Sequence, residues 1–260
     1  MHVAGVTAGA ARPGVFDAHF HIIDPRFPLR PNQGFVPEPF TIEDYRRRVS
    51  HLGVVGGAVV SGSFQGVGQA HLVEALSRLG SRFVGVTQLP ATIADEDLRA
   101  LAEAGVRAVR FNPYRGGAAA LEELEAVAWR VHEVAGWHVE LYLDSADLPE
   151  LGPRLRRLPR VVIDHLGLTP TGFDELLRLV DAGLWVKASG FGRVSLNVPA
   201  ALRALYRVNP GGLVFGTDLP STRARRPFRD ADVDLVLECL GEEGGRRVLL
   251  ENGLALYGLR

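Results

Sequence analysis

Two histidines two residues apart, His19 and His21, follow a short apolar segment near the start of the 260-residue chain. In an extended strand, residues i and i+2 point to the same face, so both imidazoles would converge on one point. Neutral imidazole is the commonest protein ligand for divalent transition metals. On its own, however, the pair fits a hydrogen-bonded polar cluster at least as well as a functional site.

A third histidine and a carboxylate occur in similar settings. His165 lies in the segment Ile-Asp-His-Leu-Gly after an apolar run, and Asp218 lies in the segment Gly-Thr-Asp-Leu-Pro after another. Packing alone gives little reason for three imidazoles and one carboxylate at such positions if their strands share one sheet. We therefore predict that His19, His21, His165 and Asp218 form one site.

Eight short apolar segments alternate with eight segments of helical period, and one more helix follows. Strands are expected at residues 15–20, 54–61, 83–88, 106–111, 138–143, 160–164, 184–189 and 213–216. Helices are expected at residues 42–52, 68–79, 95–104, 119–135, 148–158, 173–182, 199–208, 230–240 and 242–257. This alternation predicts an α/β protein with a parallel sheet, and eight units close a single (β/α)8 TIM barrel. An open doubly wound sheet is the alternative, but no strand is followed by Gly-x-Gly-x-x-Gly.

Active sites of such barrels lie at the C-terminal ends of the strands, which selects further polar candidates. Strand alternation points Arg110, Glu140 and Lys187 into the barrel. Lys187 is the only lysine in a chain with 28 arginines. Whether Lys187 and Glu140 form a structural ion pair or tune the site is left open. The loop 24–40 contains five prolines and is predicted to form a semi-rigid lid over the mouth.

The composition of the chain limits the kinds of partner that it is expected to bind. Hydrophobic residues make up 47% and charged residues 23%, which is typical of a globular domain, and the net charge is −1. The balance gives no basic surface for nucleic acid or a membrane, and no apolar run approaches the ~18 residues of a spanning helix. The one cysteine, Cys239, cannot form an internal disulfide. Residues 1–14 lack a signal-peptide pattern and are expected to form a flexible segment before a barrel domain of residues 15–260. We expect a cytoplasmic protein, and a homo-oligomer is left open.

The predicted site resembles that of the amidohydrolase superfamily, in its amidohydrolase-2 branch. The resemblance rests on His19-x-His21, His165 and Asp218 in Gly-Thr-Asp-x-Pro, and it spans residues 15–257. Members are barrel hydrolases, lactonases and decarboxylases, many with one or two divalent metal ions. Here Tyr142 stands where many members carry a fourth histidine, and Arg110 stands where a metal-bridging lysine is found. A binuclear centre is therefore not expected.

What remains is similar to the lactonase group, in particular the 2-pyrone-4,6-dicarboxylate lactonases, which can work without a metal. The resemblance implies that Asp218 is the general base for water and that the three histidines polarise the lactone carbonyl. It also implies substrate contacts by Ser63, Tyr142, Arg110, Arg115 and Arg193. An arginine holds a carboxylate through a fork of donors at any working pH, so the three arginines indicate a substrate with two or three carboxylates.

We therefore predict a hydrolase that opens a small carboxylate-bearing lactone, such as a pyrone dicarboxylate. Lactone opening needs a water, a base beside it and a group that stabilises the oxyanion. One alternative is a mononuclear amidohydrolase or decarboxylase in which His19, His21, His165 and Asp218 bind a Zn or Mn ion. The other is a barrel that binds a small acid without turnover.

Overall fold

The computed structural model describes residues 13–115 and 118–259, and for residues 115 and 118–121 it describes the backbone only. All eight strands run parallel in one sheet, in the order β1 to β8. The strands are β1 (Val15–Phe20), β2 (Val54–Val60), β3 (Phe83–Thr87), β4 (Val106–Phe111), β5 (His138–Leu141), β6 (Val161–Ile163), β7 (Trp185–Ala188) and β8 (Leu213–Phe215). The predicted (β/α)8 barrel is confirmed, and the open doubly wound sheet is excluded.

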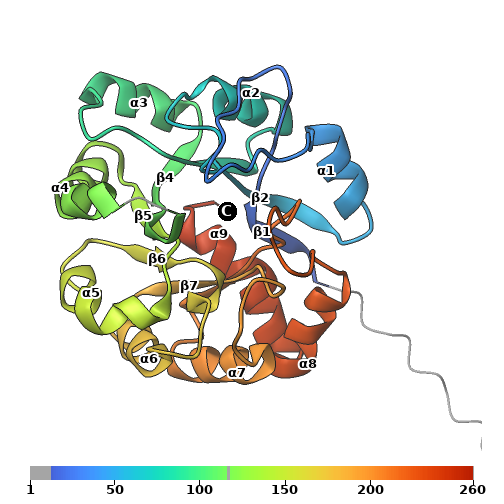
Figure 1. Cartoon of the computed structure of the whole chain (residues 1–260). Helices are drawn as coiled ribbons and strands as arrows, with labels where there is room; N and C mark the ends of the chain where they lie inside the picture. Colours follow the sequence, from blue (N-terminus) through green and yellow to red (C-terminus); the bar gives the residue numbers. More distant parts are fainter. Residues whose placement is uncertain (1–12, 116–117, 260) are drawn as a thin grey trace, which may run out of the picture.

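The helices cover the outside of the barrel, and Figure 1 shows α1 to α8 as a ring around the strands. They are α1 (Ile42–Val49), α2 (Ala70–Leu79), α3 (Asp95–Glu103), α4 (Ala118–Ala135), α5 (Leu148–Leu155), α6 (Phe173–Asp181), α7 (Val198–Val208), α8 (Ala231–Arg246) and α9 (Asn252–Leu256). Thr41 starts α1 with a capping box, in which its hydroxyl accepts from the Asp44 amide and the Asp44 carboxylate accepts from the Thr41 amide. Gly80 and Gly183 follow α2 and α6 with φ of +95° and +104°, a region that favours glycine.

The end of the chain differs from the prediction in one respect. The helix expected at residues 242–257 is interrupted by a π-helical turn at Arg247–Glu251, between α8 and α9. The wider turn coincides with the anchoring of Asn252, whose side-chain amide donates to the Pro210 and Leu213 carbonyls at 2.8 Å each. The break expected between residues 240 and 242 is present, since Gly241 has a φ of +73° inside α8.

Two apolar layers lie on either side of the sheet. Val139, Leu141 and Val186 belong to the outer layer between strands and helices. The inner layer fills the barrel, and α9 closes its lower end with Tyr257, which packs against Phe16 at the start of β1. Because alternate residues face opposite sides of a strand, Glu140 and Lys187 face the interior, as predicted.

The barrel closes between β1 and β8 through the residues that follow β8. The Asp218 amide donates to the His19 carbonyl at 2.7 Å, and the His21 amide donates to the Leu219 carbonyl at 2.8 Å. A Cβ on Gly216 would lie 2.7 Å from the His19 amide nitrogen, so this approach requires glycine. The closure therefore places Asp218 beside His19 in β1 and beside His21, which follows that strand.

Asp17 ties this closure together, although the sequence did not single it out. Its buried carboxylate accepts from the Thr217 amide at 2.8 Å, from the Thr217 hydroxyl at 2.7 Å and from the Tyr45 hydroxyl at 3.0 Å. Burial raises the pKa of Asp17 to about 6, against the lowering effect of these hydrogen bonds.

Within the described residues, no helix combines the length and apolarity that crossing a bilayer would need. Residues 1–12 of the expected flexible segment lie outside the described residues, so the boundary at residue 15 stays a prediction.

Candidate active site

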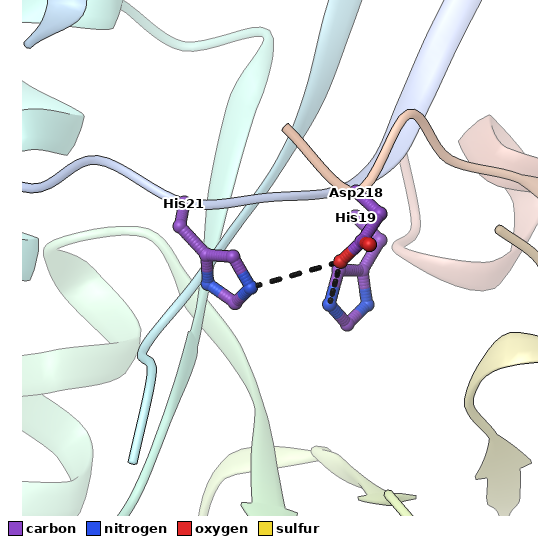
Figure 2. Close-up of side chains that lie close together, drawn as sticks. All are labelled: His19, His21 and Asp218. Atoms are coloured by element: carbon purple, nitrogen blue, oxygen red, sulfur yellow. Dashed lines mark ion pairs between the residues drawn. The ribbon is translucent and has the colours of Figure 1, made fainter. Parts of the chain in front are cut away.

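Three imidazoles surround one carboxylate oxygen at the mouth of the barrel. The distances from Asp218 Oδ1 to Nε2 of His19, His21 and His165 are 4.0, 4.0 and 3.9 Å. All four side chains are buried. Figure 2 shows the contacts of Asp218 with both His19 and His21. The structure therefore brings the four predicted site residues together, although they come from the ends of β1, β6 and β8 and the segments that follow these strands.

Local backbone irregularities aim these side chains. The pairing of β1 with β2 shifts register between Asp17 and Phe20, which is a bulge-type irregularity. Phe20 consequently packs in the outer layer, and the histidines on either side of it face inward. His165 and Asp218 have φ of +51° and +61°, a conformation that costs energy for residues other than glycine. Such strain persists where the surrounding bonds fix the backbone.

The protonation of His21 follows from its contacts. Its Nδ1 lies 2.6 Å from the Val60 carbonyl oxygen, and because a carbonyl only accepts, Nδ1 carries the proton. Burial lowers the pKa of His21 to about 3, so the ring is neutral near pH 7. Its Nε2 therefore presents a lone pair toward Asp218.

The other two imidazoles are also neutral near pH 7. Burial, assisted by the Lys187 charge, holds the pKa of His19 well below its usual value, and burial does the same for His165. His165 Nδ1 lies 2.9 Å from the Ser189 hydroxyl. His19 Nδ1 lies 3.4 Å from the Lys187 ammonium and 3.4 Å from Asp164 Oδ1, between a donor and an acceptor.

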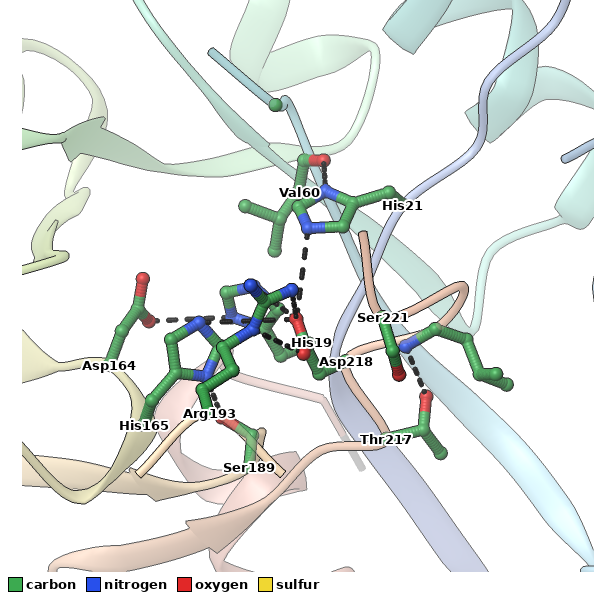
Figure 3. A network of polar contacts seen from close by, with 12 residues as sticks. His19, His21, Val60, Asp164, His165, Ser189, Arg193, Thr217, Asp218 and Ser221 are labelled. Carbon is green, nitrogen blue, oxygen red and sulfur yellow. Dashed lines mark hydrogen bonds and ion pairs between the residues drawn. The ribbon is translucent and has the colours of Figure 1, made fainter. Parts of the chain in front are cut away.

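Arg193 binds the predicted base itself. Its Nε donates to Asp218 Oδ2 at 2.5 Å, and its terminal nitrogen donates to Oδ1 at 3.0 Å, as Figure 3 shows. Burial raises the pKa of Asp218, and Arg193 opposes that rise. The guanidinium predicted to hold a substrate carboxylate thus holds the carboxylate of the protein in this structure.

Asp164 is a site residue that the sequence reasoning missed. Its Oδ2 accepts from Arg110 Nε at 2.9 Å, and its Oδ1 faces His19. Strand alternation was the available signal, because Val162 belongs to the inner layer and residue 164 faces the same side. Arg110, predicted to bind substrate, is therefore already paired with a carboxylate.

A narrow pocket with about 30 Å³ of room for water-sized molecules opens above the imidazoles. It is lined by His21, Gly62, Ser63, Phe64, Arg110, Asn112, Tyr142, His165, Arg193, Thr222 and Arg223. Ser63, Arg110, Tyr142 and Arg193 line this pocket, and their contacts with a substrate stay a prediction. The Arg115 side chain lies outside the described residues. Among the described lining residues three are arginines and none is acidic. Arg110 and Arg193 are paired with Asp164 and Asp218, so an anionic ligand would compete with these carboxylates for the guanidinium groups.

The loop 24–40 rests on the rim of this pocket. Arg223 lies over the Phe35 ring at 4.4 Å and donates to the Asn32 side-chain oxygen at 3.2 Å. The Arg30 amide donates to the Phe64 carbonyl at 2.8 Å. These contacts join the loop to two pocket-lining residues, as a lid requires. Its role as a lid stays a prediction.

A second charged group lies below the imidazoles. Lys187 Nζ is 2.5 Å from Glu140 Oε2, and Glu140 Oε1 accepts from the Tyr257 hydroxyl at 2.6 Å. His138 Nε2 lies 3.2 Å from the same oxygen. Burial disfavours ionisation of Glu140, but Lys187 and His138 outweigh it and lower its pKa to about 2. The ion pair considered from the sequence is present.

The residues present fit one divalent metal ion. Ligand atoms of His19, His21 and Asp218 lie within 4.8 Å of one another, as do those of His19, Asp164 and His165. His19 Nε2 and Asp164 Oδ1 are buried without a hydrogen-bond partner. Arg193 already occupies both oxygens of Asp218, so an ion at the first set would compete with this guanidinium.

A (β/α)8 barrel with His-x-His on β1, a histidine after β6 and an aspartate after β8 defines an amidohydrolase-type site. The family model described as "Amidohydrolase" matches residues 16–259, nearly the whole chain. The chain therefore belongs to the amidohydrolase family.

The names of similar proteins describe enzymes that act on a pyrone or a lactone. The chain is 28% identical to "2-pyrone-4,6-dicarbaxylate hydrolase" of Comamonas testosteroni, covering 94% of this chain and 90% of the relative. It is 30% identical to "D-galactarolactone isomerase" of Agrobacterium fabrum, covering 99% of this chain and 96% of the relative. A crystal structure of an Agrobacterium tumefaciens protein without ligand superposes with a TM-score of 0.85 at 30% identity, covering 97% and 98% of the two chains.

Proposed function

We propose that the protein hydrolyses a small lactone that bears carboxylate groups. The observation that carries the proposal is a buried carboxylate with three neutral imidazole nitrogens about 4 Å away, beneath a pocket lined by arginines. The base and the imidazoles match the needs of water attack, and the arginines match an anionic substrate. The names of the relatives support the same class of substrate.

In this mechanism Asp218 removes a proton from a water molecule. The lone pair of His21 Nε2 accepts the second hydrogen of that water and so orients it. The water oxygen attacks the lactone carbonyl carbon and forms a tetrahedral oxyanion. The bond from that carbon to the ring oxygen then breaks, and the proton held by Asp218 passes to the departing oxygen, which leaves a ring-opened acid.

His19 and His165 are assigned to the oxyanion. The Nδ1 atom of each faces a group able to donate, the Lys187 ammonium and the Ser189 hydroxyl. A neutral imidazole that accepts at Nδ1 carries its proton on Nε2 and can donate it to a carbonyl oxygen. His21 thus serves the water, and His19 and His165 serve the carbonyl.

His19, His21 and Asp218 would hold a divalent ion such as Zn or Mn, which would lower the pKa of a bound water and polarise the carbonyl. Arg110, Arg193 and Tyr142 hold the substrate carboxylates in either case, and Ser63 contacts the substrate from the β2 side. Metal content is therefore a separate question from the role of Asp218.

The test is a panel of lactones with and without carboxylates, assayed with the purified full-length chain before and after chelation. We expect 2-pyrone-4,6-dicarboxylate or a related acid to be opened faster than uncharged lactones. Activity that disappears on chelation and returns with Zn or Mn identifies the metal-dependent alternative. Binding of carboxylated lactones without opening identifies a small-acid-binding barrel, and decarboxylation without ring opening identifies the decarboxylase. Either of the last two results contradicts the proposal.

A further inference from the structure

The contacts of Arg193 point to a role beyond holding substrate. We propose that Arg193 is a latch on Asp218 that an anionic substrate releases, so that the base acts only on lactones that carry a carboxylate. This inference rests on the proposed function, because it explains how that reaction selects its substrate.

The geometry of the pair carries the inference. Arg193 contacts both oxygens of Asp218, through Nε at 2.5 Å and a terminal nitrogen at 3.0 Å. Such forked, charge-assisted hydrogen bonds are the strongest that a carboxylate makes with a side chain. Arg193 lines the pocket, whereas Asp218 lies behind it and is 1% exposed. A ligand that enters the pocket therefore meets the guanidinium before it meets the base.

The contact with Arg193 disfavours proton uptake by Asp218, which is what a general base must do. If Asp218 took a proton while held by Arg193, both charge-assisted bonds would weaken and the guanidinium would be left in a buried place without a counter-charge. The guanidinium must therefore turn away before proton transfer. An incoming carboxylate also offers Arg193 two oxygen acceptors, so a pair of hydrogen bonds to the substrate replaces the pair to Asp218. An uncharged lactone offers no such partner and leaves the latch closed.

The surroundings allow a side-chain exchange on a fixed backbone. The Arg193 amide donates to the Gly190 carbonyl at 2.7 Å, and a Cβ on Gly192 would lie 1.8 Å from the Arg226 carbonyl oxygen. The loop therefore has little room to move. Tyr142, a second residue of the pocket lining, interacts with the Arg193 guanidinium. In the proposed release, the Arg193 side chain rotates away from Asp218 while the backbone stays in place.

The first experiment measures binding without turnover, with glutarate as the probe and calorimetry as the readout. Asp218→Asn removes the internal competitor, so we expect glutarate to bind about tenfold or more tightly than to the wild type. The matched control is Asp218→Asn combined with Arg193→Gln, in which the gain should vanish. Equal or weaker binding to Asp218→Asn, or a gain that survives in the double variant, overturns the latch.

The second experiment separates the anion from the substrate. With uncharged δ-valerolactone as substrate, added acetate should occupy Arg193 and raise the wild-type rate about tenfold or more. In Arg193→Gln acetate should have no such effect, and the assay is run across pH so that the base is ionised in both proteins. No activation of the wild type, or equal activation of the variant, overturns the latch. If the wild type opens no lactone at all, the proposed function fails, and the glutarate comparison still decides whether Arg193 competes for Asp218.

Discussion

Two groups of charged side chains occupy the barrel interior at different depths. The upper layer, at the mouth, contains His19, Asp164 and Asp218, and the lower layer contains Glu140 and Lys187. The two layers differ in how completely their polar atoms are paired. In the lower layer, Glu140 is held by Lys187, Tyr257 and His138. In the upper layer, His19 Nε2 and Asp164 Oδ1 are buried without hydrogen-bond partners. Buried polar atoms are rarely left in this state unless a ligand or water completes them. The comparison separates a layer of paired side chains from a layer with unsatisfied buried atoms, and the second is the layer proposed to receive reactants.

The backbone follows the same division. Turns at the lower end that need a positive φ use glycine, as at Gly80 and Gly183. At the mouth, positive φ values fall on His165, Asp218 and Ser221, for which they are costly. Strain is therefore concentrated around the candidate site, where the side chain matters more than the conformational preference.

The largest effect is expected from the upper layer. Asp218→Asn keeps the shape of the side chain and removes the proton acceptor, so we expect kcat on the best lactone to fall about 10²- to 10⁴-fold. Affinity for the carboxylated substrate should not fall, because the pocket arginines remain. Steady-state kinetics and calorimetry measure the two quantities.

The matched control is Asp181→Asn, an exposed aspartate at the end of α6, on the side of the barrel away from the mouth. Its kcat should equal that of the wild type. If Asp218→Asn retains more than a few per cent of wild-type activity, the assignment of the base is wrong.

The next effect tests the lower layer and concerns stability. Lys187→Met leaves the buried Glu140 carboxylate without its cation, and we expect a loss of about 3–5 kcal/mol in the free energy of unfolding. Denaturant unfolding measures it. The double variant Lys187→Met with Glu140→Gln should recover much of this loss, because no buried charge is left alone. A single variant as stable as the wild type would show that the lower layer is not a supporting ion pair.

The smallest effect concerns His71 on α2, which supports the rim from outside the barrel. Its Nε2 lies 3.1 Å from the Ser61 hydroxyl, and burial lowers its pKa to about 4. Below its ordinary pKa of 6.5 the folded state binds fewer protons at this group than the unfolded state, so stability rises with pH between about 4 and 6.5. On acidification across that window, the wild type should lose about 3 kcal/mol through this histidine.

His71→Gln should remove that contribution, so its stability should fall less between about pH 7 and pH 4 than that of the wild type. Unfolding curves at both pH values give the difference between the two slopes, and absolute stabilities cancel from it. Parallel pH dependences would show that His71 is solvated in solution.

The sequence was sufficient to predict the fold and the convergence of His19, His21, His165 and Asp218, whose roles stay predictions. Alternation of apolar strands with helical segments predicted the barrel, and the rule that strand ends form the mouth selected His19, His21, His165 and Asp218. Strand ends were less accurate: the sixth strand was expected at residues 160–164 and spans Val161–Ile163. Such limits depend on hydrogen bonds to neighbouring strands, which no local pattern contains.

Partners of the charged residues could not be predicted. Arg110 pairs with Asp164 and Arg193 with Asp218, and in each case the two residues belong to different strand–loop units. Alternation indicates which side of a strand a residue faces but not which residue faces it across the barrel. The role of Asp17 could not be predicted either. Residues 17 and 19 would share one face of a regular strand, but β1 has a register shift between Asp17 and Phe20. Asp17 therefore contacts Thr217 and Tyr45, whereas His19 faces Asp218.

The candidate site lies at the junction between β1 and β8, so activity requires that the chain has been synthesised past β8. Thr217 and Asp17, which hydrogen-bond across that junction, are 200 positions apart in the chain. A nascent polypeptide contains His19 and His21 early in synthesis, yet it lacks Asp218 until the last strand, β8, has been made. Bringing such distant segments together is slow compared with local helix formation. Appearance of turnover during refolding would therefore time the final joining of the two ends, after most of the helical signal has returned.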